Sequence, residues 1–343
     1  MESILDHLGV TTPTMAAPMA GGPSTPQLVA AAGAAGSFGF LAAGYRTPQQ
    51  LADQITHTRV LTGRFGVNLF APNPVPVDPR AFRSYAAALQ PIADRFGLEL
   101  SGAAIVEDDD CWQDKVDLLL QAPVPVVSFT FGMPDRRVVS AFQRAGTVTA
   151  QTVTSVDEAR VATDLGVDVL VVQAAAAGGH WGTFSPDRPP EQLPLPDLVR
   201  SVRASVPLPL LAAGGIGTAK QVRAVLGAGA EAVVVGTVLL RCPESGASGV
   251  HKAAVADAGR GQPVLTRAFS GRPARGLPNA FIDFGDRIAP SGYPAVHHLT
   301  SPLRRAATEA GEPELVNLWA GTGFRHADDS PAAEVLTRLA ALS

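Results

Sequence analysis

The alternation of apolar and amphipathic segments constrains the fold of this chain more than any other feature. From residue 124 onward, short apolar runs are expected as strands over residues 124–131, 147–153, 167–173, 208–213 and 232–239. Segments of helical composition separate them, over residues 135–145, 155–165, 196–205 and 218–226. Continuous apolar runs are typical of strands buried on both faces, and strands that alternate with helices form a parallel sheet.

The same rhythm is present earlier in the chain. Three further strands are expected over residues 14–18, 38–42 and 65–70, with helices over residues 26–35 and 48–61. Eight strand-and-helix units in about 240 residues match the size of a closed (β/α)8 barrel, the TIM barrel. An open, doubly wound α/β sheet is the alternative.

Two regions break the pattern and predict the division of the chain. Residues 71–79 contain four prolines and open an insertion that continues as a helix over residues 79–96. An acidic run, Asp108 to Asp110, is expected to start a helix over residues 111–121, where it would stabilise the positive end of the helix dipole. After residue 242 the sequence is rich in Gly, Pro and Arg. We expect a barrel over residues 1–242 with an insertion near 71–96, a smaller cap or lid segment over 243–302, and C-terminal helices over 303–343 that close on the barrel.

Composition excludes several classes of protein. The 343 residues carry a formal net charge of −4, which gives no basic field for nucleic acid or an acidic membrane surface. No apolar run reaches the roughly 20 residues that span a bilayer, and the first residues do not have the pattern of a signal peptide. The two cysteines, Cys111 and Cys242, match no metal-binding spacing, and no histidine lies near the acidic run. A cytoplasmic protein without a metal site is expected.

Two glycine-containing loops follow the last two expected strands. Leu211-Ala-Ala-Gly-Gly-Ile-Gly-Thr218 contains Gly214 and Gly215, and Gly236-Thr237 follows the next strand. In TIM barrels these two positions form the usual phosphate-binding site, because small residues and a helix start let backbone N–H groups approach an anion. The alternative is a pair of tight turns. No Walker loop is present, and the glycine spacing does not fit a dinucleotide fingerprint.

Three polar side chains stand at or near the ends of apolar strands. Asn68 and Gln173 are amides within apolar runs, where burial without a partner would cost a few kcal/mol. Each could bond the backbone, and together they would suit a neutral heterocycle such as a flavin or a nucleobase. His180 follows the small-residue loop Ala174 to Gly179. It is a candidate base that removes a proton from carbon or stabilises negative charge, and the alternative is an ordinary loop histidine.

At these residues the chain resembles the FMN-dependent nitronate monooxygenases, formerly called 2-nitropropane dioxygenases. The resemblance rests on Ala16-Ala-Pro-Met-Ala-Gly-Gly22, Gly66-Val-Asn-Leu-Phe70, the Gln173 to Gly182 loop, Ala212-Ala-Gly-Gly-Ile216 and Gly236-Thr237. The first subclass of the family is similar in its tail, in Phe269 to Gly276, Tyr293-Pro294 and Leu318-Trp-Ala-Gly321. The motifs cover nearly the whole chain in order.

The resemblance implies a cofactor, a reaction and a set of site residues. FMN would lie against Ala17, Pro18 and Met19, bond Asn68 and Gln173, and extend its phosphate towards Gly178, Gly179, Gly214, Gly215, Gly236 and Thr237. His180 would be the catalytic residue beside the substrate. The implied reaction oxidises alkyl nitronates, and nitroalkanes, with molecular oxygen through a flavin semiquinone to a carbonyl compound and nitrite.

Other readings remain open at this point. FMN-dependent enoyl-acyl-carrier-protein reductases, which use a nicotinamide, share the barrel, the Gly-Gly-His loop and the phosphate loops. A flavin-binding accessory protein without turnover is a further alternative. The physiological substrate, the use of NAD(P)H and the choice between monomer and homodimer are not determined by the sequence.

This chain also departs from the family pattern beside the expected site. Ala174 replaces a glycine, Ala176 an acidic residue and Trp181 an arginine in the histidine loop, and Val234 and Thr322 each replace a common glutamine. Losing an acid and an arginine next to His180 is expected to change the pKa of its imidazole and the shape of the substrate pocket.

Overall fold

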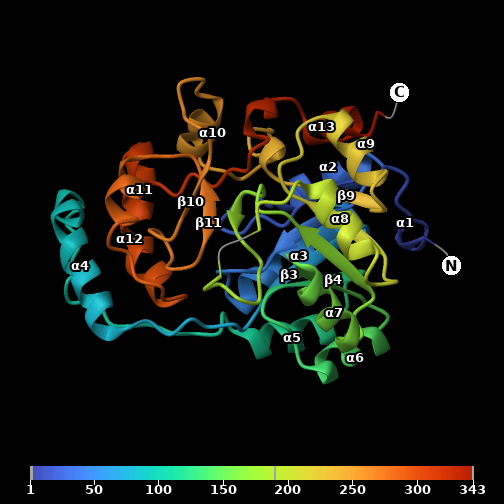
Figure 1. Ribbon diagram of the computed structural model, residues 1–343, viewed down its shortest axis with the longest axis horizontal. Helices are drawn as coiled ribbons and strands as arrows, with labels where there is room; N and C mark the ends of the chain where they lie inside the picture. Colours follow the sequence, from blue (N-terminus) through green and yellow to red (C-terminus); the bar gives the residue numbers. More distant parts are fainter. Residues whose placement is uncertain (1–2, 189–190, 342–343) are drawn as a thin grey trace.

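The strands form one closed parallel barrel, which confirms the predicted (β/α)8 fold. A computed structural model describes residues 3–188 and 191–341. The last barrel strand closes on the first, with Met15 paired to Val234. In order around the barrel, the strands are β1 (Thr14–Ala16), β2 (Gly39–Ala42), β3 (Phe65–Ala71), β4 (Val126–Phe131), β5 (Val148–Val153), β6 (Val169–Gln173), β8 (Leu210–Ala213) and β9 (Ala232–Val235) (Figure 1).

Helices cover the outside of the barrel, and their ends are encoded locally. Thr47 and Thr218 each form a capping box with a glutamine three residues later, which satisfies free N–H groups at the helix start. A short helix, α1 (Ile4–His7), precedes the barrel. The helices between the strands and at the chain end are α2 (Pro26–Ala34), α3 (Pro48–Leu61), α5 (Trp112–Gln121), α6 (Arg136–Arg144), α7 (Val156–Leu165), α8 (Leu195–Arg203), α9 (Ala219–Leu226) and α13 (Ala332–Ala340).

Several strand boundaries differ from the sequence prediction for identifiable reasons. The strands expected from residues 124 and 208 begin two residues later, because Pro125 and Pro209 have no N–H to donate to a ladder. The run expected as a strand to residue 239 ends at Val235, where Gly236 leads into a 3-10 turn, η2 (Thr237–Leu239). The two proline-linked shifts are two residues each, and the strand before Gly236 is four residues shorter than expected.

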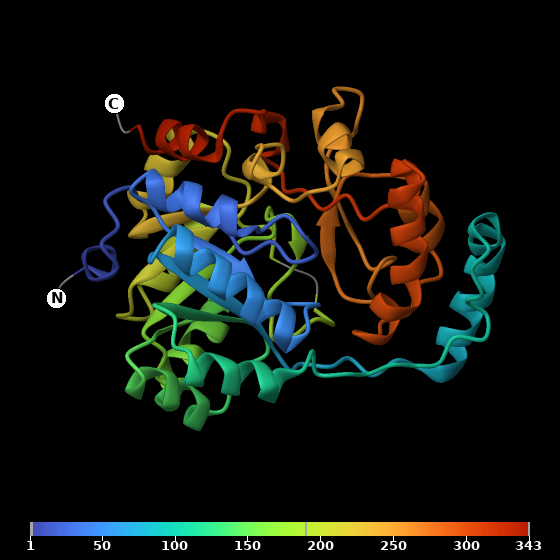
Figure 2. The same ribbon diagram turned by 180° about the vertical axis from the view of Figure 1, so that it is seen from behind.

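The proline-rich insertion carries a helix away from the barrel. α4 (Pro79–Ala93) continues as η1 (Asp94–Phe96) and lies beside α12 (Ala295–Glu309), at the end of the molecule opposite the chain termini (Figure 2). The α4 face shares one apolar cluster with α11 (Ala280–Gly285) and α12, in which Phe82, Tyr85 and Leu89 pack with residues that include Phe281 and Leu299. The C-terminal helices were expected from residue 303, but α12 starts earlier, at Ala295, and contains Pro302 in its interior.

A small antiparallel sheet joins the barrel loops to the C-terminal region. β10 (Val264–Thr266), β11 (Ala274–Gly276) and β7 (Gly179–His180) pair in that order, with Ala274 opposite His180. The helix α10 (Gly249–Ala256) precedes this sheet, and 3-10 turns η3 (Pro313–Leu315) and η4 (Phe324–His326) follow α12. The division of the chain into barrel, cap and closing helices stays a proposal. Over the described residues, no helix combines the length and apolar character needed to cross a bilayer.

Candidate functional site

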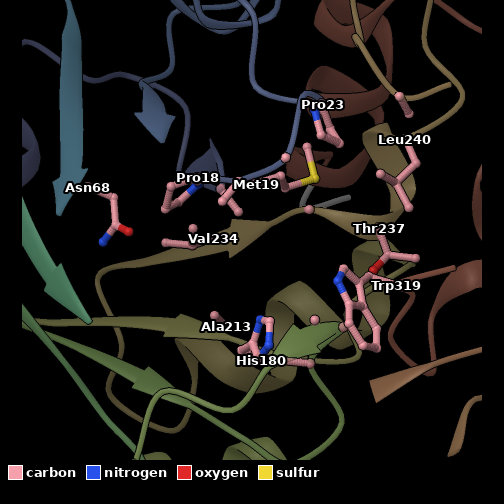
Figure 3. A pocket seen from close by; sticks show the side chains of 18 of the residues that line it. Pro18, Met19, Pro23, Asn68, His180, Ala213, Val234, Thr237, Leu240 and Trp319 are labelled. Carbon is pink, nitrogen blue, oxygen red and sulfur yellow. The ribbon is translucent and has the colours of Figure 1, made fainter. Parts of the chain in front are cut away.

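A cavity of about 370 Å³ lies at the carboxyl ends of the barrel strands. In the close view, His180 and Ala213 lie on one side of it and Pro18, Met19 and Val234 on the other (Figure 3). The structure brings every predicted site residue to this cavity: Ala17, Pro18, Met19, Asn68, Gln173, Gly178, Gly179, His180, Gly214, Gly215, Gly236 and Thr237. The carboxyl ends of the strands are where TIM-barrel sites form, so the location has a physical reason.

The two strand amides are each half satisfied by protein. The Asn68 Nδ2 group donates to the Ser128 carbonyl at 3.3 Å and to the hydroxyls of Ser128 and Thr130 at 3.0 Å. The Gln173 Oε1 atom accepts from the Gly182 N–H at 2.7 Å. Because a carbonyl can only accept and an N–H can only donate, these contacts fix both amide orientations.

The remaining amide atoms are directed to the cavity. Within residues 3–188 and 191–341, Asn68 Oδ1 and Gln173 Nε2 have no protein partner and do not belong to the buried unpartnered atoms, and both side chains line the cavity. The site therefore presents a hydrogen-bond acceptor from β3 and a donor from β6. One atom of each amide bonds the backbone, as one of the two alternatives predicted. The other atom of each amide is free to bond a heterocycle in the cavity.

Small residues bring the backbone close to the opposite part of the cavity. Gly214 and Gly215 have φ values of +124° and +75°, in the left-handed region that favours glycine. A Cβ on Gly215 would lie 2.7 Å from Thr322 Oγ1 and 2.9 Å from the Ala176 Cβ. The tail of the chain is tied to these loops, because the Gly321 N–H donates to Thr237 Oγ1 at 3.0 Å. No larger side chain fits between the loop and this tail.

His180 lies in the edge strand of the small antiparallel sheet and packs against aromatic rings. Its Nε2 atom is 2.8 Å from Ser270 Oγ. The rings of Phe131, Tyr293 and Trp319 have centroids 5.8, 5.8 and 5.4 Å from the imidazole. Burial, with smaller contributions from the positive charges of two arginines, lowers the pKa of His180 to about 3. The imidazole is therefore neutral at pH 7 and carries a free lone pair.

Those two arginines have no carboxylate partner among the described residues. Arg272 is 0% exposed, donates to the Thr183 carbonyl at 2.6 Å, and lies 4.1 Å above the Phe131 ring. Arg304 donates to Thr300 Oγ1 and Asn317 Oδ1, both at 3.1 Å. Burial lowers the pKa of each guanidinium to about 10, so both are charged at pH 7. An electropositive region faces His180 and favours an anion there.

Several aromatic residues around the cavity were not predicted as site residues from the sequence. Tyr45 follows β2, stacks on His297 with centroids 4.0 Å apart, and accepts a hydrogen bond from Tyr293 Oη at 3.2 Å. Phe131 ends β4 with a φ of +82°, which is strained for a bulky residue. Trp319 lines the cavity from the tail. Tyr45 and Phe131 stand at strand carboxyl ends, and this position was the signal that could have singled them out.

Glu158 also has a function that its sequence position did not reveal. Its place after Ser155 predicts a capping box, and Ser155 does cap α7. The carboxylate itself, 8% exposed, bonds elsewhere. One oxygen accepts from the Thr154 N–H and hydroxyl at 2.6 and 2.8 Å, and the other from the Thr183 hydroxyl and the Phe184 N–H, both at 2.7 Å. Glu158 thus ties the loop that carries His180 to the loop after β5.

Comparisons with known proteins agree with this arrangement. A probable nitronate monooxygenase of Staphylococcus aureus (strain Newman) is 36% identical over 338 residues, which are 97% of this chain and 94% of the relative. A nitroalkane oxidase structure from Streptomyces ansochromogenes is 45% identical, with a TM-score of 0.93, and covers 99% of this chain and 97% of its own. A variant of FabK from Thermotoga maritima is 26% identical, with a TM-score of 0.73, over 99% of this chain and 95% of its own.

The family comparison spans almost the whole sequence. The family model described as nitronate monooxygenase matches residues 2–341, which include the barrel, the insertion and the tail. The match thus contains every loop that lines the cavity, together with the aromatic rings and arginines around His180. The chain belongs to the nitronate monooxygenase family of oxidoreductases.

Proposed function

We propose that this protein oxidises alkyl nitronates, and the nitroalkanes from which they form, with molecular oxygen, and that FMN bound in the cavity is the cofactor. Family membership and the 45% identity to the Streptomyces nitroalkane oxidase support the reaction class. The proposal includes a cytoplasmic enzyme that needs no metal ion and acts as a monomer or homodimer.

The observation that carries the cofactor proposal is the pair of fixed amides. The pyrimidine edge of a flavin contains both donors and acceptors, and the cavity offers the acceptor Asn68 Oδ1 and the donor Gln173 Nε2. The loops at Gly214, Gly215 and Gly236 would hold the phosphate end, and Ala17 to Met19 would lie along the ring. When bound, FMN supplies an electron acceptor for the substrate and passes the electrons to oxygen.

The residues of this chain can generate a nitronate from a nitroalkane. Neutral His180 accepts a proton from the carbon that bears the nitro group, and the C–H electrons remain in the resulting nitronate. The positive charges of Arg272 and Arg304 stabilise the negative charge that develops on the nitro oxygens. The aromatic rings that surround His180 exclude water and so strengthen this electrostatic effect.

An anaerobic spectral titration of the purified protein, supplemented with FMN, tests the proposal. Addition of a nitronate should bleach the absorbance of the bound flavin, and oxygen should restore it with release of nitrite. Bleaching by NAD(P)H alone would instead support an enoyl-thioester reductase, and a bound flavin that responds to neither would support an accessory protein. Absence of flavin binding would overturn the cofactor proposal.

A substitution at the base adds a test of the proton transfer. His180→Asn should keep bound FMN and reduce turnover of a neutral nitroalkane by roughly 100-fold or more, which is the usual contribution of a positioned base. A preformed nitronate needs no deprotonation, so its turnover should fall much less. His57→Asn, at an exposed position on α3, is the matched control. Unchanged nitroalkane turnover in His180→Asn would remove His180 as the base.

A further inference from the structure

Ser270 makes the one polar side-chain contact of His180 within the described residues. It lies between β10 and β11, is 1% exposed, and its Oγ atom is 2.8 Å from His180 Nε2. The same hydroxyl is 3.2 Å from the carbonyl oxygen of Arg272, and the Arg272 N–H donates to it at 3.4 Å. The Ser270 hydroxyl has a single proton, so it can donate to His180 Nε2 or to the Arg272 carbonyl oxygen, but not to both.

The Arg272 carbonyl determines the direction in which the Ser270 hydroxyl donates its proton. A carbonyl can only accept, and Ser270 is its sole side-chain or turn donor among the described residues. Leaving a buried carbonyl without a donor would carry the full desolvation cost of that group. The Ser270 proton is therefore directed to the Arg272 carbonyl. Its oxygen must then accept from His180, which places the single proton of the neutral imidazole on Nε2.

The other imidazole nitrogen is left free and accessible. Within residues 3–188 and 191–341, His180 Nδ1 has no hydrogen-bond partner, and it does not belong to the buried atoms that lack one. Since His180 lines the cavity, this nitrogen is reached from the cavity.

We propose that Ser270 is a positioning residue that fixes His180 as its Nε2–H tautomer, so that the Nδ1 lone pair is the proton acceptor. The assignment of His180 as a base rests on the proposed function, whereas the tautomer itself does not. The hydrogen bonds run from His180 Nε2–H to Ser270 Oγ, and from Ser270 Oγ–H to the Arg272 carbonyl. When Nδ1 takes the proton from the substrate carbon, the Nε2–H bond to Ser270 is retained, so the chain needs no rearrangement during the transfer.

Nitrogen NMR of the protein labelled with ¹⁵N-histidine tests the tautomer directly, because protonated and unprotonated ring nitrogens resonate in separate regions. The His180 signals are identified by their loss in His180→Asn. The native protein should show a protonated Nε2 and an unprotonated Nδ1. His251 is an internal reference, because its Nε2 lies 3.0 Å from the Trp319 carbonyl and must also carry the proton. A native His180 protonated on Nδ1 would overturn the proposal whether or not the Ser270 variants fold.

Substitutions then test the dependence on Ser270. In Ser270→Ala the His180 signals should move towards a mixture of tautomers, and Ser270→Thr, which keeps the hydroxyl, should restore the native pattern. Thr266→Val removes another buried hydroxyl of the same segment, bonded to Asp286, and should leave the His180 signals unchanged. An unaltered tautomer in Ser270→Ala would contradict the proposed role.

Kinetics separate this role from a general packing effect. Ser270→Ala should lower kcat/KM for a neutral nitroalkane about fivefold, which is the effect of losing one ordinary hydrogen bond, and leave a preformed nitronate nearly unaffected. Equal losses for both substrates would indicate a merely structural residue. If the protein turns over neither substrate, the proposed function fails, while the NMR result still decides the tautomer.

Discussion

Replacing Glu158 with glutamine should destabilise the protein far more than an exchange of carboxylate for amide does at the surface. The Glu158 carboxylate receives four hydrogen bonds, and each oxygen faces one backbone N–H and one threonine hydroxyl. A glutamine must turn its NH₂ group towards one of these pairs. The threonine hydroxyl there can rotate and accept, but the backbone N–H of Thr154 or Phe184 cannot.

The cost can be worked out from these contacts. One buried backbone N–H loses its acceptor, which costs about 1–3 kcal/mol. The bonds that remain are no longer assisted by a full negative charge, which removes about a further 1 kcal/mol. Glu158→Gln should therefore lower the free energy of unfolding by about 2–4 kcal/mol. The loss should also loosen the loop from Thr183 to Phe184, so turnover that depends on His180 should fall.

Urea unfolding of Glu158→Gln beside Asp157→Asn measures this difference. Asp157 is the preceding residue in the first turn of α7, its side chain is 91% exposed, and its partner is the surface residue Arg160 at 3.3 Å. Both variants lose a charge near the same helix N-terminus, so the difference between them measures the hydrogen bonds by which Glu158 joins the two loops. Asp157→Asn should cost less than about 1 kcal/mol. Equal midpoints for the two variants would refute this role of Glu158.

Two further predictions concern the glycine loop at Gly215 and the buried histidines. Gly215→Val should prevent flavin binding, because its φ of +75° and the 2.7 Å approach of its Cβ to the tail leave no room; Gly146→Ala, at a φ of +80° in open space, should keep full flavin absorbance at a cost of about 1 kcal/mol. Full flavin occupancy in Gly215→Val would show that the Gly215 loop does not hold the phosphate end of the flavin. Burial lowers the pKa values of His180 and His251 from 6.5 to about 3 and about 4. Below pH 6.5 these histidines bind protons in the unfolded chain but stay neutral in the folded protein. The urea midpoint should therefore fall from pH 6.5 to pH 4, and His251 alone should lower the free energy of unfolding by about 3 kcal/mol. A midpoint that does not change with pH would contradict these shifts.

The barrel could be predicted because its signal is local and repeated. Each apolar run buried on both faces is readable in five or six residues, and residues such as Thr47 and Thr218 mark the helix starts without reference to the rest of the chain. The strand ends were less accurate where a proline removed a ladder donor, as at Pro125 and Pro209. The start of α12 was missed because Pro302 suggested a helix beginning, whereas tertiary packing with α4 holds the helix through it.

The candidate site was predictable only for residues attached to barrel strands. Asn68 and Gln173 were conspicuous because an amide is rare in an apolar run, and His180 because it ends a loop of small residues. Arg272 and Arg304 gave no such signal, since they are distant from His180 in the sequence and act on it only in the folded structure. Contacts between segments some 90 or more residues apart, such as His180 with Ser270, cannot be read from local pattern.

The structure suggests physical consequences for two residues of the His180 loop that differ from the family pattern, Ala176 and Trp181. Position 181 is 8% exposed, so an arginine there would have to bury its charge. Trp181 fills the space without charge. Ala176 lies beside Gly215, so an acidic residue there would place negative charge next to the glycine loop. The barrel strands and their loops thus supply the amides and glycines suited to a cofactor, while later residues supply the positive charges of Arg272 and Arg304 and the Ser270 contact of His180. Changes in substrate preference among relatives should therefore trace to the cap and to residues 176 and 181 more than to the barrel strands.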